Sequence, residues 1–305
     1  FQNNFPDSNI IVFDCFRSES KFSNGNLKSF GHFKNLSGFK GKIICGNINY
    51  QNNLDLLSDY KFDYIFHQAA ISDTRVYDQT VIMETNINSF YNLLKIAKKD
   101  KAVMVYASSA ATYGSMASPQ TEGHESPDNP YGFSKLIMDQ IASQYAKENP
   151  EMIIVGLRYF NVYGPGEFYK AKTSSMVIQL GHQILSGKAP RLFKESDKIF
   201  RDFIYIDDAI QANIKACSPK KNGTYNIGTG NPRSFQDIAD IRQEDLGTTF
   251  KTEYFSNPYD GYQFHTQANI LSSTKYIDFQ PKFSLEQGIN KYLPEIKRLF
   301  GKENT

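Results

Sequence analysis

Residues 102–109 read Ala102-Val-Met-Val-Tyr-Ala-Ser-Ser109, a run of apolar side chains that ends in two serines. The apolar residues are consecutive and do not alternate with polar ones, which is typical of a strand covered on both faces of a parallel sheet. Similar runs, each followed by a polar residue or glycine, occupy residues 9–13, 42–45, 64–66 and 152–157. Helix-like stretches at 80–98 and 130–146 lie between them. This alternation predicts an α/β fold with a doubly wound parallel sheet of the Rossmann type.

The composition excludes several other classes of protein. The chain has 305 residues, enough for a sizeable core, and its 34 Lys and Arg nearly balance its 32 Asp and Glu. A net charge of +2 gives no electrostatic footprint for nucleic acid or for an anionic membrane surface. The apolar runs, at about five residues, are too short to cross a bilayer. The three cysteines show no metal-ligand spacing, so we expect no metal site and a reducing, cytoplasmic compartment.

The pattern of the chain changes near Pro165, where the segments become mixed and richer in loops. We expect residues 1–164 to form a dinucleotide-binding Rossmann domain. Residues 165–305 are expected to form mainly a smaller, mixed α/β substrate-binding domain, with segments at about 200–230 returning to the first sheet.

Asp14 directly follows the run at 9–13. An acid at the end of the second strand of a dinucleotide fold accepts hydrogen bonds from the adenosine ribose hydroxyls. A turn-forming acid that merely ends the strand is the simpler alternative. Arg17 is close enough in sequence to neutralise a 2′-phosphate, so these two residues do not separate NAD from NADP.

The glycine-rich turn that holds the pyrophosphate in such sites has no counterpart before Asp14. We expect that the sequence lacks its first strand and glycine loop, and that Phe1 lies inside the helix that follows that loop. The alternative is that the cofactor site has been lost.

Tyr131 and Lys135 are spaced so that both side chains lie on one helix face, one turn apart. We expect the ammonium of Lys135 to bind the nicotinamide ribose and to lower the pKa of the Tyr131 phenol, which makes a phenolate available near neutral pH. With 19 tyrosines, such a pair arises by chance about once or twice in a chain of this kind. Ser109 makes the pattern specific, because its hydroxyl follows a buried strand and can bond the same substrate oxygen.

These motifs resemble those of the extended short-chain dehydrogenase/reductase superfamily, whose nucleotide-sugar enzymes read Ser-Ser-Ala-x-x-Tyr-Gly followed by Tyr-x-x-x-Lys. The two motifs stand here at 108–114 and 131–135. Further matches run along the whole chain, at residues 66–70, 157–165, 201–208 and 225–230. Sugar 4,6-dehydratases of this superfamily carry an acidic pair where this chain has Ala110 and Ala111, which disfavours dehydration.

Residues 166–176, with 191–196 and 262–268, resemble the branch of nucleotide-sugar epimerases that acts on ADP-heptose. This resemblance implies an isomerase that inverts C6″ of ADP-D-glycero-β-D-manno-heptose for the lipopolysaccharide core. It implies a bound NADP, with NAD possible, that removes hydride to leave a 6″-ketone and returns it to the other face. Inversion requires an acid/base on each side, and the family places these at Tyr131 and Lys170.

Two alternatives remain open at the level of sequence. A C4 epimerase of a UDP- or GDP-hexose would keep Ser109, Tyr131 and Lys135 but would have no need of Lys170. A non-catalytic scaffold that binds nucleotide sugars would explain the absent glycine loop. Without the resemblance, a solvated loop lysine is the simpler interpretation of Lys170.

The resemblance also implies the binding residues. Those expected to contact the cofactor are Asp14, Cys15, Arg17, Asn47, Ile48, Gln68, Ala69, Ala70, Ile71, Ser72, Asn86, Lys135 and Val162. Those expected to contact the substrate are Asn161, Lys172, Gln179, Phe193, Lys194, Glu195, Ser196, Arg201 and Tyr262. Arg201 is the expected diphosphate clamp, because its planar fork suits phosphate oxygens; a salt bridge to Asp207 is the alternative.

Other expectations concern neighbouring positions and partners. Gly166 stands where the family usually has Arg, and His67 is expected to be a packed residue with no catalytic role. The ADP-heptose substrate is the expected small-molecule partner, with no nucleic acid and no membrane. The resemblance alone implies a cyclic homo-oligomer, a pentamer or a pair of pentamers.

Overall fold

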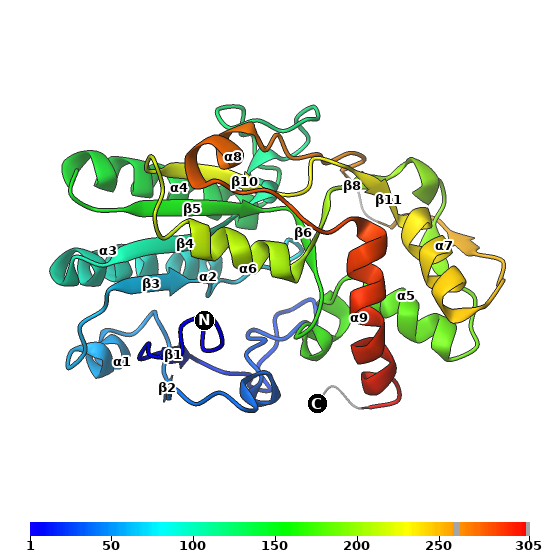
Figure 1. The fold of residues 1–305 in the computed structure, drawn as a ribbon, viewed down its shortest axis with the longest axis horizontal. Helices are drawn as coiled ribbons and strands as arrows, with labels where there is room; N and C mark the ends of the chain where they lie inside the picture. The colour runs from blue at the N-terminus through cyan, green and yellow to red at the C-terminus, as the bar shows by residue number, and fades with distance from the viewer. Residues whose placement is uncertain (259–262, 303–305) are drawn as a thin grey trace.

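The structure is a computed structural model, and it describes residues 1–258 and 263–302. Its centre is a four-stranded parallel sheet (Figure 1). The strands follow the order β10 (Gly223–Ile227), β5 (Ile154–Tyr159), β4 (Val103–Ser109) and β3 (Tyr64–His67). A second parallel pair, β1 (Ile11–Asp14) and β2 (Lys42–Cys45), lies beside β3 without pairing to it.

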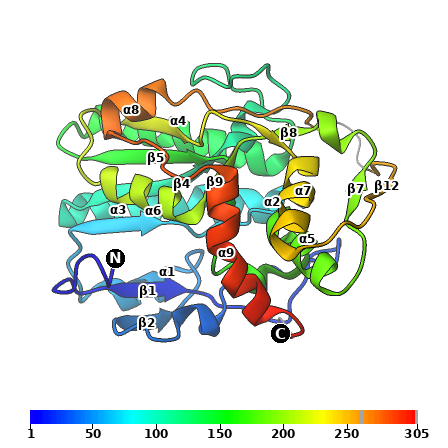
Figure 2. The ribbon, with the colours of Figure 1, turned by 45° about the vertical axis from the view of Figure 1, so that its right-hand side comes forward.

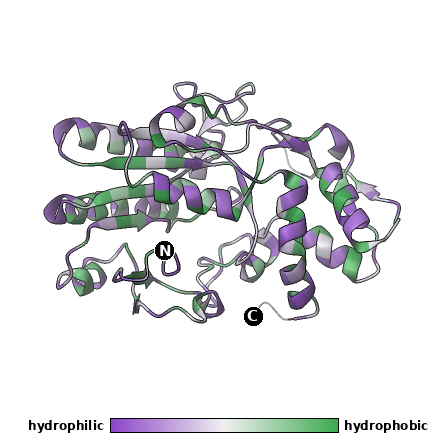
Figure 3. Ribbon diagram, viewed as in Figure 1, coloured by the Kyte–Doolittle hydropathy of each residue, from purple (hydrophilic) through white to green (hydrophobic). Residues whose placement is uncertain are grey.

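Both faces of the central sheet are covered, because alternate residues of a strand point to opposite sides. Met104 and Tyr106 of β4 lie in one apolar core, and Val105 between them lies in another. The helices that line these cores are α3 (Ser89–Asp100) and α4 (Pro130–Glu148) for the first, α6 (Ile206–Lys215) and α8 (Leu271–Ile277) for the second. Figure 3 shows β5 as hydrophobic over most of its length and hydrophilic toward its carboxyl end. The predicted doubly wound parallel sheet is confirmed.

The helix predicted over 80–98 is interrupted. It consists of α2 (Gln79–Met83), a π-helical turn over Glu84–Asn88, and then α3. Such turns are often found at functional sites, since the wider turn displaces one side chain from the regular helical path. Here the turn contains Asn86, which is fully buried.

The carboxyl-terminal half adds a helical layer and short strand pairs (Figure 2). The helices α5 (Met176–Leu185), α7 (Phe235–Leu246) and α9 (Leu285–Leu299) share a third apolar core. The strand pairs are β6 (Asn161–Tyr163) with β9 (Phe203–Tyr205), β8 (Phe200–Arg201) with β11 (Arg233–Ser234), and β7 (Arg191–Phe193) with β12 (Glu253–Phe255). The remaining short helices are α1 (Gln51–Leu54) and the 3₁₀ turns Phe33–Leu36, Asp55–Leu57, Ala110–Tyr113, Phe168–Thr173 and Ser196–Lys198.

The first ten residues form turns, so the prediction that Phe1 lies inside a helix is wrong. One turn is closed by a hydrogen bond of 2.8 Å from the amide N of Phe5 to the carbonyl O of Phe1. Pro6 then prevents a helix from continuing, because it has no N–H and disfavours the helical conformation of the residue before it. The ring of Phe1 packs against Phe66 of β3, with 4.3 Å between the ring centroids.

Asp202, between β8 and β9, joins three segments that are distant in the sequence. Its buried carboxylate accepts hydrogen bonds from the amides of Thr229 (2.6 Å), Gly230 (2.8 Å) and Ala268 (2.9 Å) and from the hydroxyl of Thr229 (2.7 Å). We expect Asp202→Ala to lower the free energy of unfolding by about 3 kcal/mol or more, because the three amides lose their acceptor. Urea denaturation measures this change.

The matched control is Asp207→Ala. Asp207 forms an exposed ion pair of 2.6 Å with Lys291, and its loss is expected to change the free energy of unfolding by less than about 1 kcal/mol. Equal effects of the two substitutions would contradict the role given to Asp202.

Candidate active site

Residues predicted to bind the cofactor or to perform chemistry, together with the packed His67, lie at the carboxyl ends of the parallel strands. Asp14 ends β1, His67 ends β3 and Ser109 ends β4. Open α/β sheets bind their ligands at this edge, because all the loops that follow the strands meet there. The edge therefore defines the candidate active site.

The structure brings Ser109, Tyr131 and Lys135 together. Helix α4 begins with Asn129 as its cap, whose side chain accepts the amide of Gly132 at 2.8 Å, so Tyr131 stands in the first turn. The Nζ of Lys135 lies 5.9 Å from the centroid of the Tyr131 ring. The Ser109 hydroxyl interacts with the Tyr131 phenol. This geometry is that of a general acid/base held between a hydroxyl and an ammonium.

Gly132 is needed for this approach. A Cβ at this position would lie 2.3 Å from the carbonyl O of Ala111, so helix α4 packs directly on the 3₁₀ turn Ala110–Tyr113. Any larger residue would push the helix, and with it Tyr131, away from Ser109.

The charge states of Tyr131 and Lys135 follow from the burial of both side chains. Lys135 is almost completely buried, and burial lowers its pKa to about 8, while the carboxylate of Asp139 acts to raise it. Burial raises the pKa of the Tyr131 phenol, and the hydrogen bond with Ser109 acts to lower it. The predicted lowering of the Tyr131 pKa by Lys135 is therefore not found. The Lys135 ammonium instead donates to the carbonyl O of Ala107 at 2.7 Å.

Asn86 fixes the loop that follows β3. Its Oδ1 accepts the amide of Ile71 at 2.9 Å, and its Nδ2 donates to the carbonyl O of Ile71 (3.1 Å) and to the hydroxyl of Ser134 (2.9 Å). This loop contains the predicted cofactor residues Gln68, Ala69, Ala70, Ile71 and Ser72. Asn86 thus links that loop to α4, one residue before Lys135. The Gln68 side chain donates to Asn213 on α6 at 3.2 Å.

The residues expected at the adenosine end lie after β1 and β2. Asp14 accepts the amide of Phe16 on its Oδ1 at 2.6 Å, and a Cβ at Gly31 would lie 2.2 Å from the same oxygen. Arg17 donates to the carbonyl O of Tyr169 at 3.5 Å. Three other predicted residues lie at this end. The thiol of Cys15 donates a hydrogen bond to the hydroxyl of Ser29, and the side chain of Asn47 accepts the amide of Asn49. Ile48 is buried.

His67 is the packed residue that the sequence predicts. It is buried, its ring stacks on Phe90 with centroids 5.7 Å apart, and burial together with the charge of Lys135 lowers its pKa to about 3. It is therefore neutral at physiological pH.

Lys170 lies in a loop that is closed at its base by Glu167. The Glu167 carboxylate accepts the amide and the hydroxyl of Ser175 at 2.6 and 2.7 Å and the amide of Gly164 at 3.3 Å. On the outer side, the ring of Tyr169 stacks on His32 with 3.8 Å between centroids. Within the described chain, no hydrogen bond or ion pair joins Lys170 to Ser109, Tyr131 or Lys135.

The predicted substrate residues occupy the carboxyl-terminal half and β6. Arg201 is buried, donates to the carbonyl O atoms of Phe200 (2.9 Å) and Gln263, and lies over the ring of Phe235. The alternative salt bridge to Asp207 is not formed, since Asp207 pairs with Lys291. Tyr262 lies outside the described residues.

The other substrate candidates are distributed over several elements. Asn161 and Val162 lie on β6, Lys172 in the 3₁₀ turn with Lys170, Gln179 on α5, Phe193 on β7, and Lys194, Glu195 and Ser196 just after β7. Glu195 and Lys198 form an exposed ion pair of 2.9 Å. Ser196 is buried, and its hydroxyl has no hydrogen-bond partner among the described residues.

Three residues that matter to the site are absent from the sequence predictions. Glu167 closes the loop of Lys170, and Asp139 and Arg158 form a buried ion pair next to Lys135. Asp139 had a usable signal, because it continues the spacing of Tyr131 and Lys135 by one more helical turn. Asp139 and Arg158 are 19 residues apart, so no local pattern identifies their pair. Glu167 bonds to Gly164 and Ser175, which are near it in sequence, but a lone glutamate in a loop does not by itself indicate that role.

Comparison with known proteins agrees with this geometry. The sequence pattern of the "NAD dependent epimerase/dehydratase family" matches residues 8–228. A curated ADP-L-glycero-D-manno-heptose-6-epimerase from Brachyspira hyodysenteriae is 34% identical over 306 residues, which covers 98% of this chain and 93% of that protein. The crystal structure of the Helicobacter pylori ADP-L-glycero-D-manno-heptose-6-epimerase is 47% identical with a TM-score of 0.89, and covers 97% of this chain and 90% of its own.

A more distant structure shares the fold alone. The UDP-glucose 4-epimerase of Thermotoga maritima, solved with UDP-glucose, has a TM-score of 0.83 at 23% identity, over 97% of this chain and 94% of its own.

Proposed function

Because the chain belongs to the NAD dependent epimerase/dehydratase family, we propose that it inverts C6″ of ADP-D-glycero-β-D-manno-heptose to give the L-glycero epimer. It is an isomerase. The observation that carries this conclusion is the grouped Ser109, Tyr131 and Lys135 in a chain similar over nearly its whole length to two heptose 6-epimerases. The loop with Lys170 supplies the second acid/base that inversion requires.

The described residues fit a nicotinamide dinucleotide at both of its ends. The Asp14 carboxylate offers its Oδ2, which accepts no hydrogen bond within the described chain, to the adenosine ribose. The Lys135 ammonium has three protons and donates one to the carbonyl O of Ala107 and one to the Sδ of Met138, so the third can bind the nicotinamide ribose. When bound, the dinucleotide accepts and returns a hydride. We propose NADP as the dinucleotide because the resemblance implies it, since Asp14 and Arg17 do not separate NADP from NAD.

The chain's own groups move the protons. Tyr131 acts as its phenolate: it takes the proton of the C6″ hydroxyl as that carbon is oxidised and becomes a phenol, while Ser109 donates a hydrogen bond to the same oxygen. Lys135, with a pKa of about 8, is mostly protonated at neutral pH, and its ammonium stabilises the phenolate before the proton is taken. After the 6″-ketone has turned in the site, Lys170 protonates its oxygen on the opposite side.

Further parts of the proposal rest on the resemblance alone. We place nucleotide binding in residues 1–164 and substrate binding mainly in residues 165–305. The enzyme is a cytoplasmic homo-oligomer, and its product enters the lipopolysaccharide core. Among the described residues, the helices are too short or too polar to span a membrane.

The decisive experiment follows the C6″ epimer ratio by NMR, with the purified full-length protein and ADP-D-glycero-β-D-manno-heptose. We expect conversion to the L-glycero epimer without added nicotinamide, because the hydride returns to the same substrate. UDP-glucose and GDP-mannose serve as controls and should remain unchanged. Failure to convert the heptose with NADP⁺ supplied, or C4 epimerisation of a hexose, would contradict the proposal.

A further inference from the structure

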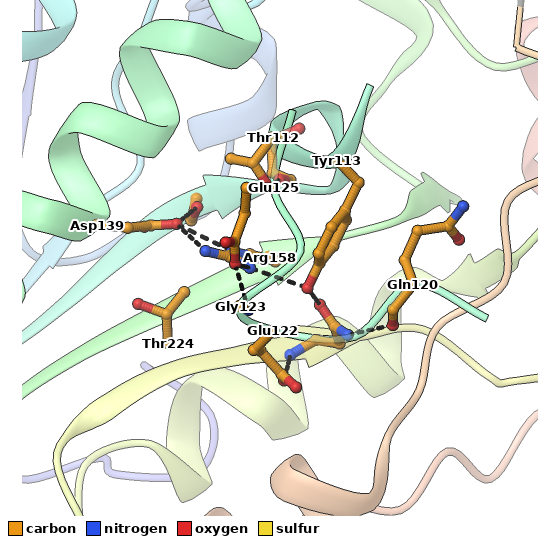
Figure 4. Close-up of polar contacts among 12 residues, drawn as sticks. Thr112, Tyr113, Gln120, Glu122, Gly123, Glu125, Asp139, Arg158 and Thr224 are labelled. Carbon is orange, nitrogen blue, oxygen red and sulfur yellow. Dashed lines mark hydrogen bonds and ion pairs between the residues drawn. The ribbon is translucent and has the colours of Figure 1, made fainter. Parts of the chain in front are cut away.

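Asp139, one helical turn after Lys135, forms a buried ion pair with Arg158 (Figure 4). The guanidinium of Arg158, on β5, donates from Nε (2.9 Å) and Nη2 (2.8 Å) to the Oδ2 of Asp139, on α4. The exposed fractions are 3% for Arg158 and 6% for Asp139. An ion pair so far from solvent is weak evidence for stability by itself, because desolvation of both charges opposes their attraction.

The Asp139 carboxylate uses both of its oxygens. Besides Arg158, Oδ2 accepts the hydroxyl of Ser108 at 2.9 Å, and Oδ1 accepts the hydroxyl of Tyr106 at 2.9 Å. Both donors belong to β4, so the carboxylate connects helix α4 to the strand that ends in Ser109. Successive strand residues point to opposite faces. When Asp139 holds Ser108 on one face, the position of Ser109 on the other is held as well.

Asp139 also lies one helical turn after Lys135, on the same face of α4. Among the described residues, the other groups around Lys135 supply no negative charge in the resting site: the Tyr131 phenol on the same helix is neutral, His67 of β3 is neutral, and Ala107 of β4 offers only its carbonyl O. The positive charge of Arg158 on β5 is balanced by Asp139 and Glu125. The charge of Asp139 acts to raise the pKa of Lys135, against the lowering by burial.

We propose that Asp139 is a positioning residue of the epimerase, which keeps the Lys135 side chain in its ammonium form and sets the spacing between Ser109 and Tyr131. This inference rests on the proposed function, since it assigns Lys135 a part in the reaction. An ion pair with a purely structural role would stabilise the fold without any effect on the charge of Lys135. The two roles differ in what happens when the charge of Asp139 alone is removed.

Asp139→Asn is the test, because asparagine has nearly the same shape and can still accept from Ser108 or Tyr106. Arg158 keeps Glu125 as a partner in this variant. Without the carboxylate, Lys135 loses its proton more easily, so the alkaline limb of the kcat profile moves to lower pH by about one unit. We expect kcat to fall about fivefold at pH 8, about tenfold near pH 9 and less than about threefold at pH 6.

Ser108→Ala is the matched control. It removes one hydrogen bond from the same carboxylate but leaves the charge, so the alkaline limb should stay in place even if kcat falls. An unmoved limb in Asp139→Asn, or an equal shift in Ser108→Ala, would overturn the proposal. If Asp139→Asn does not fold, the double variant Asp139→Asn, Arg158→Gln removes both buried charges together and is expected to shift the limb in the same direction.

A second readout does not depend on turnover. The pKa of Lys135 is followed by ¹³C NMR of the lysine side chains, with the Lys135→Met spectrum for assignment, and should fall in Asp139→Asn but not in Ser108→Ala. If the wild-type protein does not convert the heptose and this pKa still falls, the proposed function fails while the role of Asp139 on Lys135 stands. If the heptose is converted and the pKa does not fall, the proposal for Asp139 fails alone.

Discussion

Replacement of Tyr131 by phenylalanine is expected to lower kcat for C6″ epimerisation by about a thousandfold or more, with a smaller change in KM. The Tyr131 phenolate is the group that takes the C6″ hydroxyl proton, and phenylalanine retains its ring but cannot take or return a proton. The change removes a group that acts in the transition state and leaves the substrate contacts of the carboxyl-terminal half in place. Single-turnover conversion of ADP-D-glycero-β-D-manno-heptose, followed by NMR, measures the loss.

Tyr145→Phe is the control for this experiment. Tyr145 lies on the same helix, three turns beyond the site, and packs against the apolar core of α3 and α4. Its kcat should stay within about twofold of wild type. A Tyr131→Phe enzyme that retains more than a tenth of the wild-type kcat would show that another group moves the proton.

Lys170→Met is expected to lower kcat for epimerisation by about a hundredfold to a thousandfold. Methionine keeps much of the length and apolar volume of the lysine side chain, but it has no proton to give on the second face of the ketone. Because each acid/base serves one epimer, Lys170→Met should still oxidise one of the two epimers, and Tyr131→Phe the other. The absorbance of reduced nicotinamide, recorded after each epimer is mixed with each variant, tests this complementary behaviour.

Two other lysines give the matched comparisons. Lys172, in the same 3₁₀ turn, is expected to line the substrate pocket, so Lys172→Met should raise KM more than it lowers kcat. Lys188 follows α5 outside the site, and its replacement by methionine should leave both constants within about twofold. A Lys170→Met enzyme with wild-type kcat on the heptose would show that Lys170 is not the second acid/base.

The strands and the catalytic motif are visible in the sequence because their signals are local. A strand covered on both faces consists of consecutive apolar residues, and this pattern correctly predicts β3, β4 and β5, with β4 running from Val103 through the two serines to Ser109. Tyr131 and Lys135 share a helix face because of their spacing alone. Binding positions such as Asn86 and Arg201 come from the resemblance, since nothing in their immediate neighbours marks them as functional.

The properties of the site depend on contacts between residues far apart in the chain. Burial raises the pKa of Tyr131, and the ammonium of Lys135 donates to the carbonyl O of Ala107. The prediction from their spacing, that Lys135 lowers the pKa of Tyr131, therefore has the wrong direction. Asp139 on α4 pairs with Arg158 on β5, 19 residues further along the chain. Desolvation and hydrogen bonding depend on everything that surrounds a group, and that surrounding exists only after distant segments have packed together. Local spacing shows which side chains share a face, whereas the packed fold decides which of them carry charge and how firmly they are held.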